Sequence, residues 1–104
     1  MRTLSFAALI AALAAGAVPA LPARAADVAS GEKIYRQYCA QCHGANGIAV
    51  LPNAPSFARG DRLMQPDQVL ALTVRGGRNA MPAFAGLLNE RQIFDVVAYL
   101  RTIR

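Results

Sequence analysis

The sequence is poor in the side chains that most binding sites use, with no tryptophan, one histidine and two cysteines. A structural zinc site needs about four ligands, and the chain offers no further cysteine or histidine to complete one. It also has no run of lysines or arginines, no aromatic-rich platform and no zinc-finger spacing. We therefore expect no nucleic acid partner, although the formal charge is +5. No segment alternates between apolar and polar residues as a strand would, so an all-α fold is expected.

The chemistry of the chain centres on Cys39-Ala40-Gln41-Cys42-His43. A Cys-x-x-Cys-His motif is typical of covalent haem attachment, in which both thiols form thioether bonds and the histidine binds the iron. On a helix the two cysteines lie on the same side, directly before the histidine. A disulfide, a thioredoxin-like redox pair and half of a zinc site are the alternatives. We predict one covalent haem c, attached through Cys39 and Cys42, with His43 as the proximal iron ligand.

A second signal is Met81, which precedes Pro82 in the non-helical segment from Arg78 to Phe84. A methionine in a proline-stiffened loop can place its thioether over the other face of a haem, where a soft sulfur ligand raises the reduction potential. Met81 is therefore the candidate distal iron ligand, and a flexible core side chain is its alternative role. Met64 is the rival ligand, but it precedes a helix and lacks a following proline.

Residues 1–25 have the pattern of a secretory signal peptide. Arg2 supplies a positive start, residues 6–18 form an uncharged apolar run, and small residues precede a cleavage point near Ala25. Such a segment would direct export to the periplasm and would then be removed. The mature protein would then be a single monohaem cytochrome c domain at residues 26–104.

The alternative for residues 1–25 is a retained membrane anchor, because no charged residue lies between Arg2 and Arg24. Pro19 and Pro22 shorten the helical part below the roughly 20 residues that span a bilayer. We expect membrane contact only if this segment is retained. Without Arg2 and Arg24, nine basic and six acidic residues remain, a formal charge of +3.

The first helix is expected from about Val28 to Tyr38, with Asp27 as its N-cap. Gly31, Tyr35 and Cys39 recur at four-residue steps and share one stripe of this helix. A glycine on that stripe would let another helix approach closely beside the Tyr35 ring. An irregular link is expected over residues 57–64.

A second helix should begin at Gln65-Pro66-Asp67 and end at Gly76-Gly77. Its expected buried side consists of Val69, Leu70, Leu72 and Val74. A third helix should begin at Asn89, with Gln92 closing a capping box. Its apolar stripe consists of Ile93, Val96, Val97, Leu100 and Ile103. The expected fold is all-α, with three to four helices around one covalently attached haem.

Two supporting interactions of the haem site can be expected from the sequence. The carbonyl of Pro52 or of Pro55 would accept a hydrogen bond from the free ring N–H of His43 and fix its tautomer. Without a tryptophan, the haem propionates need other partners. The candidates are Arg59, Arg62 and Arg78.

Three motifs occur in order: Gly31-x-x-x-Tyr35-x-x-x-Cys39-x-x-Cys42-His43, Met81-Pro82-x-Phe84 and Val96-x-x-Tyr99-Leu100. Together they resemble the class I, or mitochondrial-like, c-type cytochromes, in particular the short bacterial periplasmic monohaem type. The resemblance implies the cytochrome c fold, with the attachment residues and iron ligands named above. It also implies a crossed contact between the first and last helices through Gly31, Tyr35, Val96 and Tyr99. The chain departs from the family in having no tryptophan and in the segment at residues 56–60.

The expected function is one-electron transfer, because two axial protein ligands leave the iron no open site for a substrate. A monomeric periplasmic carrier, not an enzyme, would dock weakly at the haem edge to a redox protein donor and a redox protein acceptor. Arg36, Arg75 and Arg78 are candidates for its docking rim. One alternative is a haem-based ligand sensor or peroxidase-like enzyme with a labile sixth ligand. Another is a dedicated electron-accepting subunit of a dehydrogenase or reductase.

Overall fold

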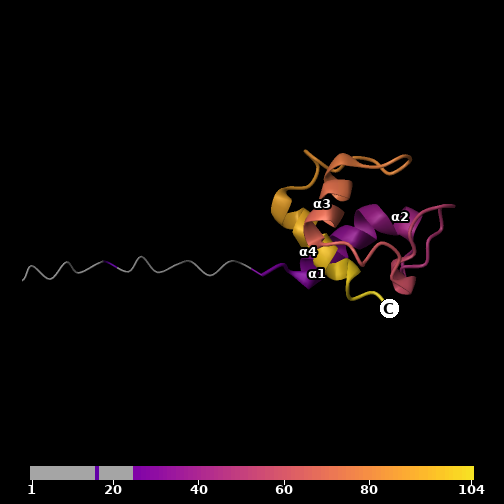
Figure 1. Cartoon of the computed structure of the whole chain (residues 1–104), viewed down its shortest axis with the longest axis horizontal. Helices are drawn as coiled ribbons and strands as arrows, with labels where there is room; N and C mark the ends of the chain where they lie inside the picture. The colour runs from indigo at the N-terminus through magenta and orange to yellow at the C-terminus, as the bar shows by residue number, and fades with distance from the viewer. Residues whose placement is uncertain (1–15, 17–24) are drawn as a thin grey trace, which may run out of the picture.

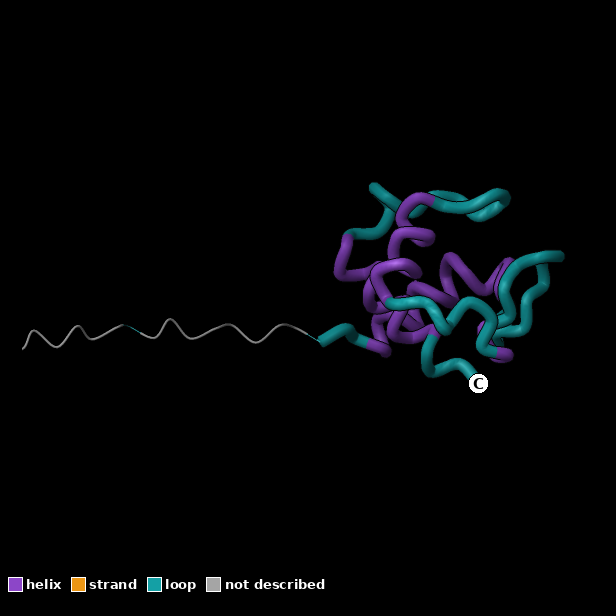
Figure 2. Tube along the Cα trace, in the orientation of Figure 1, coloured by secondary structure: helices purple, strands orange, loops and turns teal. Residues whose placement is uncertain are grey.

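The computed structural model describes Gly16 and residues 25–104. The predicted signal peptide lies outside these described residues, apart from Gly16 and Ala25, and its cleavage stays a prediction. Among the helices that the structure describes, none is both long and apolar enough to cross a membrane. The described helices lie together, with their connecting loops around them (Figure 2).

The first helical segment is longer than the sequence predicts. It runs through α1 (Val28–Ile34), a π-helical turn (Tyr35–Cys39) and α2 (Ala40–His43). Asp27 caps its start as expected, because its carboxylate accepts a hydrogen bond from the Ser30 amide at 3.1 Å. The segment therefore ends at His43 and not at Tyr38, so the whole Cys-x-x-Cys-His motif is helical.

The crossing of α1 with α4 (Glu90–Leu100) organises the core (Figure 1). A Cβ atom on Gly31 would lie 2.0 Å from the backbone oxygen of Asp95 and 3.0 Å from Cβ of Tyr99. The rings of Tyr35 and Tyr99 are 5.3 Å apart between centroids. The expected close approach at Gly31 is therefore confirmed, and a larger residue there would separate the two helices.

The third labelled helix, α3 (Asp67–Gly76), packs against α4 by a narrower face than the sequence predicts. Its buried residues are Leu70, Ala71 and Val74. Val69 is 40% exposed and Leu72 is 60% exposed, so their predicted burial is wrong. Small Ala71 occupies the packed stripe beside Leu70 and Val74, and this stripe turns the larger side chains of Val69 and Leu72 outward. Gly77 ends the helix with a φ of 71°.

The last helix confirms its predicted start. The Asn89 side chain accepts from the Gln92 amide at 2.9 Å and the Gln92 side chain accepts from the Asn89 amide at 2.9 Å, which completes the capping box. Leu100 is its final residue, followed by a turn. The link after His43 contains one short 3-10 helix, Phe57–Arg59. Within residues 25–104 no named strand occurs, only two isolated bridges, so the all-α class is confirmed.

Candidate functional site

A cavity of about 570 Å³ is lined by all four residues that the sequence singles out, Cys39, Cys42, His43 and Met81. Segments far apart in the chain meet there. They include the end of the first helical segment, the loop at residues 51–55, α3, and the segment at residues 78–84 that follows α3 in orange in Figure 1. The apolar part of the lining includes Leu70, Val74, Phe84 and Leu100. This volume and this lining are typical of a cofactor site.

The two cysteines are free and half-buried at the end of the helical segment. Burial, with the nearby Cys42 thiol as a smaller cause, raises the pKa of Cys39 to about 11. A thioredoxin-like redox pair needs the opposite, a lowered thiol pKa that supplies thiolate at neutral pH. Among the described residues no group of three or more His, Cys, Asp or Glu side chains could hold a metal ion. The geometry thus favours neither the redox pair nor the zinc site.

The imidazole of His43 is buried and held from two sides. Its Nδ1 lies 3.1 Å from the carbonyl oxygen of Pro55, and its ring stacks on Phe57 with centroids 4.7 Å apart. Because a carbonyl oxygen only accepts, Nδ1 carries the proton and donates, which leaves Nε2 free to bind a metal ion. Of the two prolines that the sequence left open, Pro55 and not Pro52 is therefore the hydrogen-bond partner of His43.

Tyr35 fixes the chain directly after the motif, a role that its place in the sequence does not predict. Its hydroxyl donates to the backbone oxygen of Gly44 at 2.7 Å in a buried position. Gly44 has a φ of 86°, and a Cβ there would lie 1.8 Å from the backbone oxygen of Ile48. The hydroxyl could not be assigned from sequence because Tyr35 and Gly44 meet only when the chain turns after His43.

Met81 lies in a tight turn that is held by its own backbone. The amide of Met81 donates to the oxygen of Arg78 at 2.9 Å, and the amide of Arg78 donates to the oxygen of Met81 at 3.1 Å. Gly77 allows this approach, since a Cβ there would lie 2.6 Å from the oxygen of Met81. The Met81 side chain is half-buried at the cavity, as a ligand held in a loop requires.

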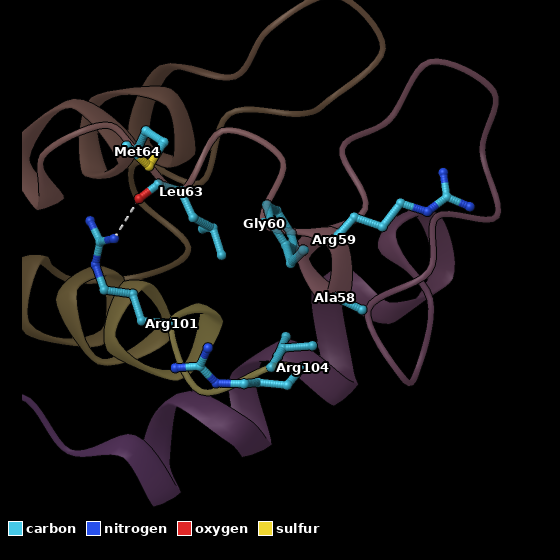
Figure 3. Close-up of a pocket in the computed structure, with 9 residues that line it drawn as sticks. Ala58, Arg59, Gly60, Leu63, Met64, Arg101 and Arg104 are labelled. Carbon is cyan, nitrogen blue, oxygen red and sulfur yellow. Dashed lines mark hydrogen bonds between the residues drawn. The ribbon is translucent and has the colours of Figure 1, made fainter.

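Met64 lies elsewhere. It is 97% exposed and lines a separate hollow of about 330 Å³ beside Gly60 and Arg101 (Figure 3). There Arg101 donates to the backbone oxygen of Leu63 at 2.8 Å. Of the two methionines in the described residues, the structure brings only Met81 to the cavity of the cysteines and His43.

The three arginines proposed for the propionates divide between the two hollows. Arg62 and Arg78 are exposed and line the larger cavity, where their guanidinium groups can pair with carboxylates. Arg59 lines the smaller hollow, so its predicted place beside a propionate is not supported. Arg59 is the last residue of the 3-10 helix and is exposed.

The chemical groups that line the cavity fit a covalently attached haem. One wall offers two unpaired thiols and a buried imidazole whose Nε2 is free, and a segment from later in the chain offers a thioether. The remaining lining is largely apolar, with arginines at the exposed positions, as a porphyrin with two propionates requires. A protein-only site would not need a thioether and two thiols beside so large an apolar cavity.

Comparisons with known proteins agree with this geometry. The family described as "Cytochrome C oxidase, cbb3-type, subunit III" matches residues 26–100. Cytochrome c6 of Thermosynechococcus vestitus is 40% identical over 101 residues, which cover 95% of this chain and 88% of that protein. Cytochrome c6 of Synechococcus sp. (strain ATCC 27167 / PCC 6312) is 41% identical over 81 residues, which cover 76% of this chain and 72% of that protein.

The solved structure of cytochrome c6 from the diatom Phaeodactylum tricornutum superimposes with a TM-score of 0.60 at 34% identity, covering 73% of this chain and 92% of that chain. The protein thus carries one covalently bound haem c and transfers electrons without being an enzyme. With its helical fold and a cavity lined by both thiols, the chain belongs to the c-type cytochrome family, as a small class I member.

Proposed function

We propose that the haem is held by thioether bonds to Cys39 and Cys42, with Nε2 of His43 and the sulfur of Met81 as its two axial ligands. The protein would then carry single electrons between two redox proteins outside the cytoplasm. The observation that carries this proposal is the meeting of these four side chains at one cavity of about 570 Å³. Bound haem would supply the ferric and ferrous states of one iron.

The residues around the ligands support a carrier over a ligand-binding protein. The Pro55 carbonyl and the Phe57 ring hold the imidazole of His43 in one orientation. The paired backbone hydrogen bonds of Arg78 and Met81 hold the backbone of Met81 in its turn. If His43 and Met81 both bind the iron, they would leave no coordination position for an external molecule, and little rearrangement of these residues would be needed between oxidation states.

The location of the protein depends on the predicted signal peptide at residues 1–25, called the leader from here on. The leader would direct export to the periplasm, and its cleavage near Ala25 would leave a mature chain that starts at Ala26. The mass of the protein recovered from that compartment tests this point, because a mass that includes residues 1–25 would show a retained segment.

The docking surface for a redox partner would surround the mouth of the cavity. Of the three arginines expected on its rim, Arg36 is bound to Glu32 at 2.8 Å and Arg75 donates to Glu90 at 2.7 Å. Arg78 has no such pair among the described residues and lines the cavity. Arg78 is therefore the one expected rim arginine that lies at the mouth of the cavity, and we propose brief contacts between this mouth and a redox partner.

An optical spectrum of the exported holoprotein, oxidised and reduced, with and without carbon monoxide, tests the ligand set. Sharp reduced bands, a weak red band in the oxidised state and no response to carbon monoxide are expected for His43 and Met81 as ligands. Rapid carbon monoxide binding would contradict the carrier and favour the ligand-sensing alternative. Size-exclusion chromatography of the same sample tests the expected monomer against a subunit of a larger enzyme.

A further inference from the structure

Asp95 is a buried acidic side chain that the haem site does not use. It lies in α4 with only 3% of its surface exposed, at the crossing of α4 with α1. Its carboxylate oxygen Oδ1 accepts a hydrogen bond from the backbone amide of Asp27 at 2.8 Å. It forms no ion pair within 4.0 Å of any residue that the structure describes. A buried carboxylate without a nearby positive charge is costly, so its compensation needs an explanation.

The position of its one partner suggests that explanation. The Asp27 amide lies one residue after Ala26, the residue that becomes the first of the chain if the leader is cleaved near Ala25. Consecutive residues are about 3.8 Å apart between Cα atoms. Cleavage would thus create a positively charged ammonium group beside the amide that Asp95 already accepts from.

We propose that the Asp95 carboxylate is the binding site for the α-ammonium group of the mature chain, so that removal of the leader itself strengthens the contact between the first and last helices. The proposal rests on the proposed leader cleavage. In the uncleaved chain the same position holds a neutral peptide group. The mature protein gains an ion pair at the helix crossing that the precursor does not have.

The other charged and titratable groups around this position do not supply the missing charge. On the α1 side, the carboxylate of Asp27 is engaged with the Ser30 amide, and Lys33 is exposed. On α4, Arg91 lies one turn before Asp95 but is exposed and forms no ion pair with a described residue. Tyr99, one turn after Asp95, packs against Gly31 and offers a phenol ring, not a cation.

A double-mutant cycle on the exported holoprotein tests the pair. One change is Asp95→Asn. The other inserts two serines between Ala25 and Ala26, which moves the ammonium group two residues away from Asp95 and keeps its charge. We expect Asp95→Asn to lower the urea midpoint clearly in the normal chain and much less in the extended chain, with a coupling of about fivefold in the unfolding equilibrium constant. Equal effects of Asp95→Asn in both chains would overturn the proposal.

Mass spectrometry first establishes the N-terminal residue of each protein. A first residue other than Ala26 in the unextended protein would overturn the proposal at this step. The haem spectrum would then still report separately on the electron carrier.

If Asp95→Asn does not fold, titration of the Ala26 α-amine by NMR decides the question with folded proteins only. An α-amine ordinarily titrates near pH 8, and a carboxylate beside it favours the charged form. The pKa of the amine should therefore be higher in the normal chain than in the extended one, and the added stability should disappear as the pH rises through that pKa. The same pKa in both chains would overturn the proposal.

Discussion

At the scale of single residues, two methionines remain after leader removal and only Met81 lines the cavity. The normal holoprotein should not bind carbon monoxide, and we expect the Met81→Ala holoprotein to bind it in a one-to-one ratio. The reduction potential of the haem should also be lower in this variant, because the iron loses its soft ligand. Met64→Ala is the matched control, since Met64 is 97% exposed and outside the cavity lining. Carbon monoxide binding by the Met64 variant alone would move the distal ligand to Met64.

Tyr35 is a residue whose role depends on its hydroxyl. Tyr35→Phe leaves the buried oxygen of Gly44 without this donor, and we expect a loss of about 1–2 kcal/mol in the free energy of unfolding of the holoprotein. Tyr38→Phe is the control, because Tyr38 is exposed, and its effect should stay within about 0.5 kcal/mol. Urea denaturation followed by circular dichroism measures both, and equal losses would show that the hydroxyl of Tyr35 is not the cause.

The same tyrosine has a testable pH dependence. Burial raises the pKa of Tyr35 to about 12 from the ordinary 10.0. The folded state therefore favours the protonated form, whose stabilising effect is fully present below pH 10 and is lost as the pH rises toward 12. The stability difference between the normal holoprotein and Tyr35→Phe should narrow over this range. A difference that stays constant from pH 9 to pH 12 would contradict this assignment.

At the scale of helices, the α1 and α4 crossing tolerates no side chain at Gly31. A methyl group there would lie 2.0 Å from the backbone oxygen of Asp95. We expect Gly31→Ala to destabilise the holoprotein by about 1–3 kcal/mol, because the backbone of α4 has to move. Gly76→Ala is the matched control in α3, where a Cβ meets nothing within 4 Å. That variant should be neutral or more stable in thermal unfolding, since alanine favours a helix.

If both glycine variants lost the same stability, helix propensity and flexibility would explain the loss and the close crossing would not.

The sequence indicates Gly31 as a close approach because of its spacing to Tyr35, and the structure confirms it. The sequence does not indicate which side of α3 is buried. Val69 and Leu72 are as apolar as Leu70 and Val74, and only the packing of α3 in the tertiary structure decides which pair is covered.

At the scale of the whole molecule, the cavity is large for a chain with a small core. Replacing both Cys39 and Cys42 by alanine should abolish covalent haem retention, visible as the loss of haem staining on a denaturing gel. The variant should also lose most of its cooperative unfolding transition, because the helices around the cavity depend on the haem for burial. Each single variant is the intermediate case, with one thioether bond left. Full haem staining in the double variant would refute covalent attachment.

The chemistry of the site could be predicted from the sequence because it depends on short local patterns. Cys39, Cys42 and His43 are neighbours in one motif, and Met81 stands beside a proline in a segment that cannot be helical. The helix start signals are local as well, since a cap such as Asn89 and its partner Gln92 lie within one turn. Such features need only the geometry of a few consecutive residues.

The tertiary structure settled the contacts between distant segments. Only the tertiary structure shows that His43 pairs with the carbonyl of Pro55 and that the Tyr35 hydroxyl donates to Gly44. It also shows that Arg59 lines the smaller hollow and that Val69 and Leu72 of α3 are exposed. Each of these depends on how loops close and where helices cross, and these distances are set by packing of the whole chain. Asp95 belongs to the same group, because an acidic residue in a helix reveals its burial and its partner only when α1 lies against it.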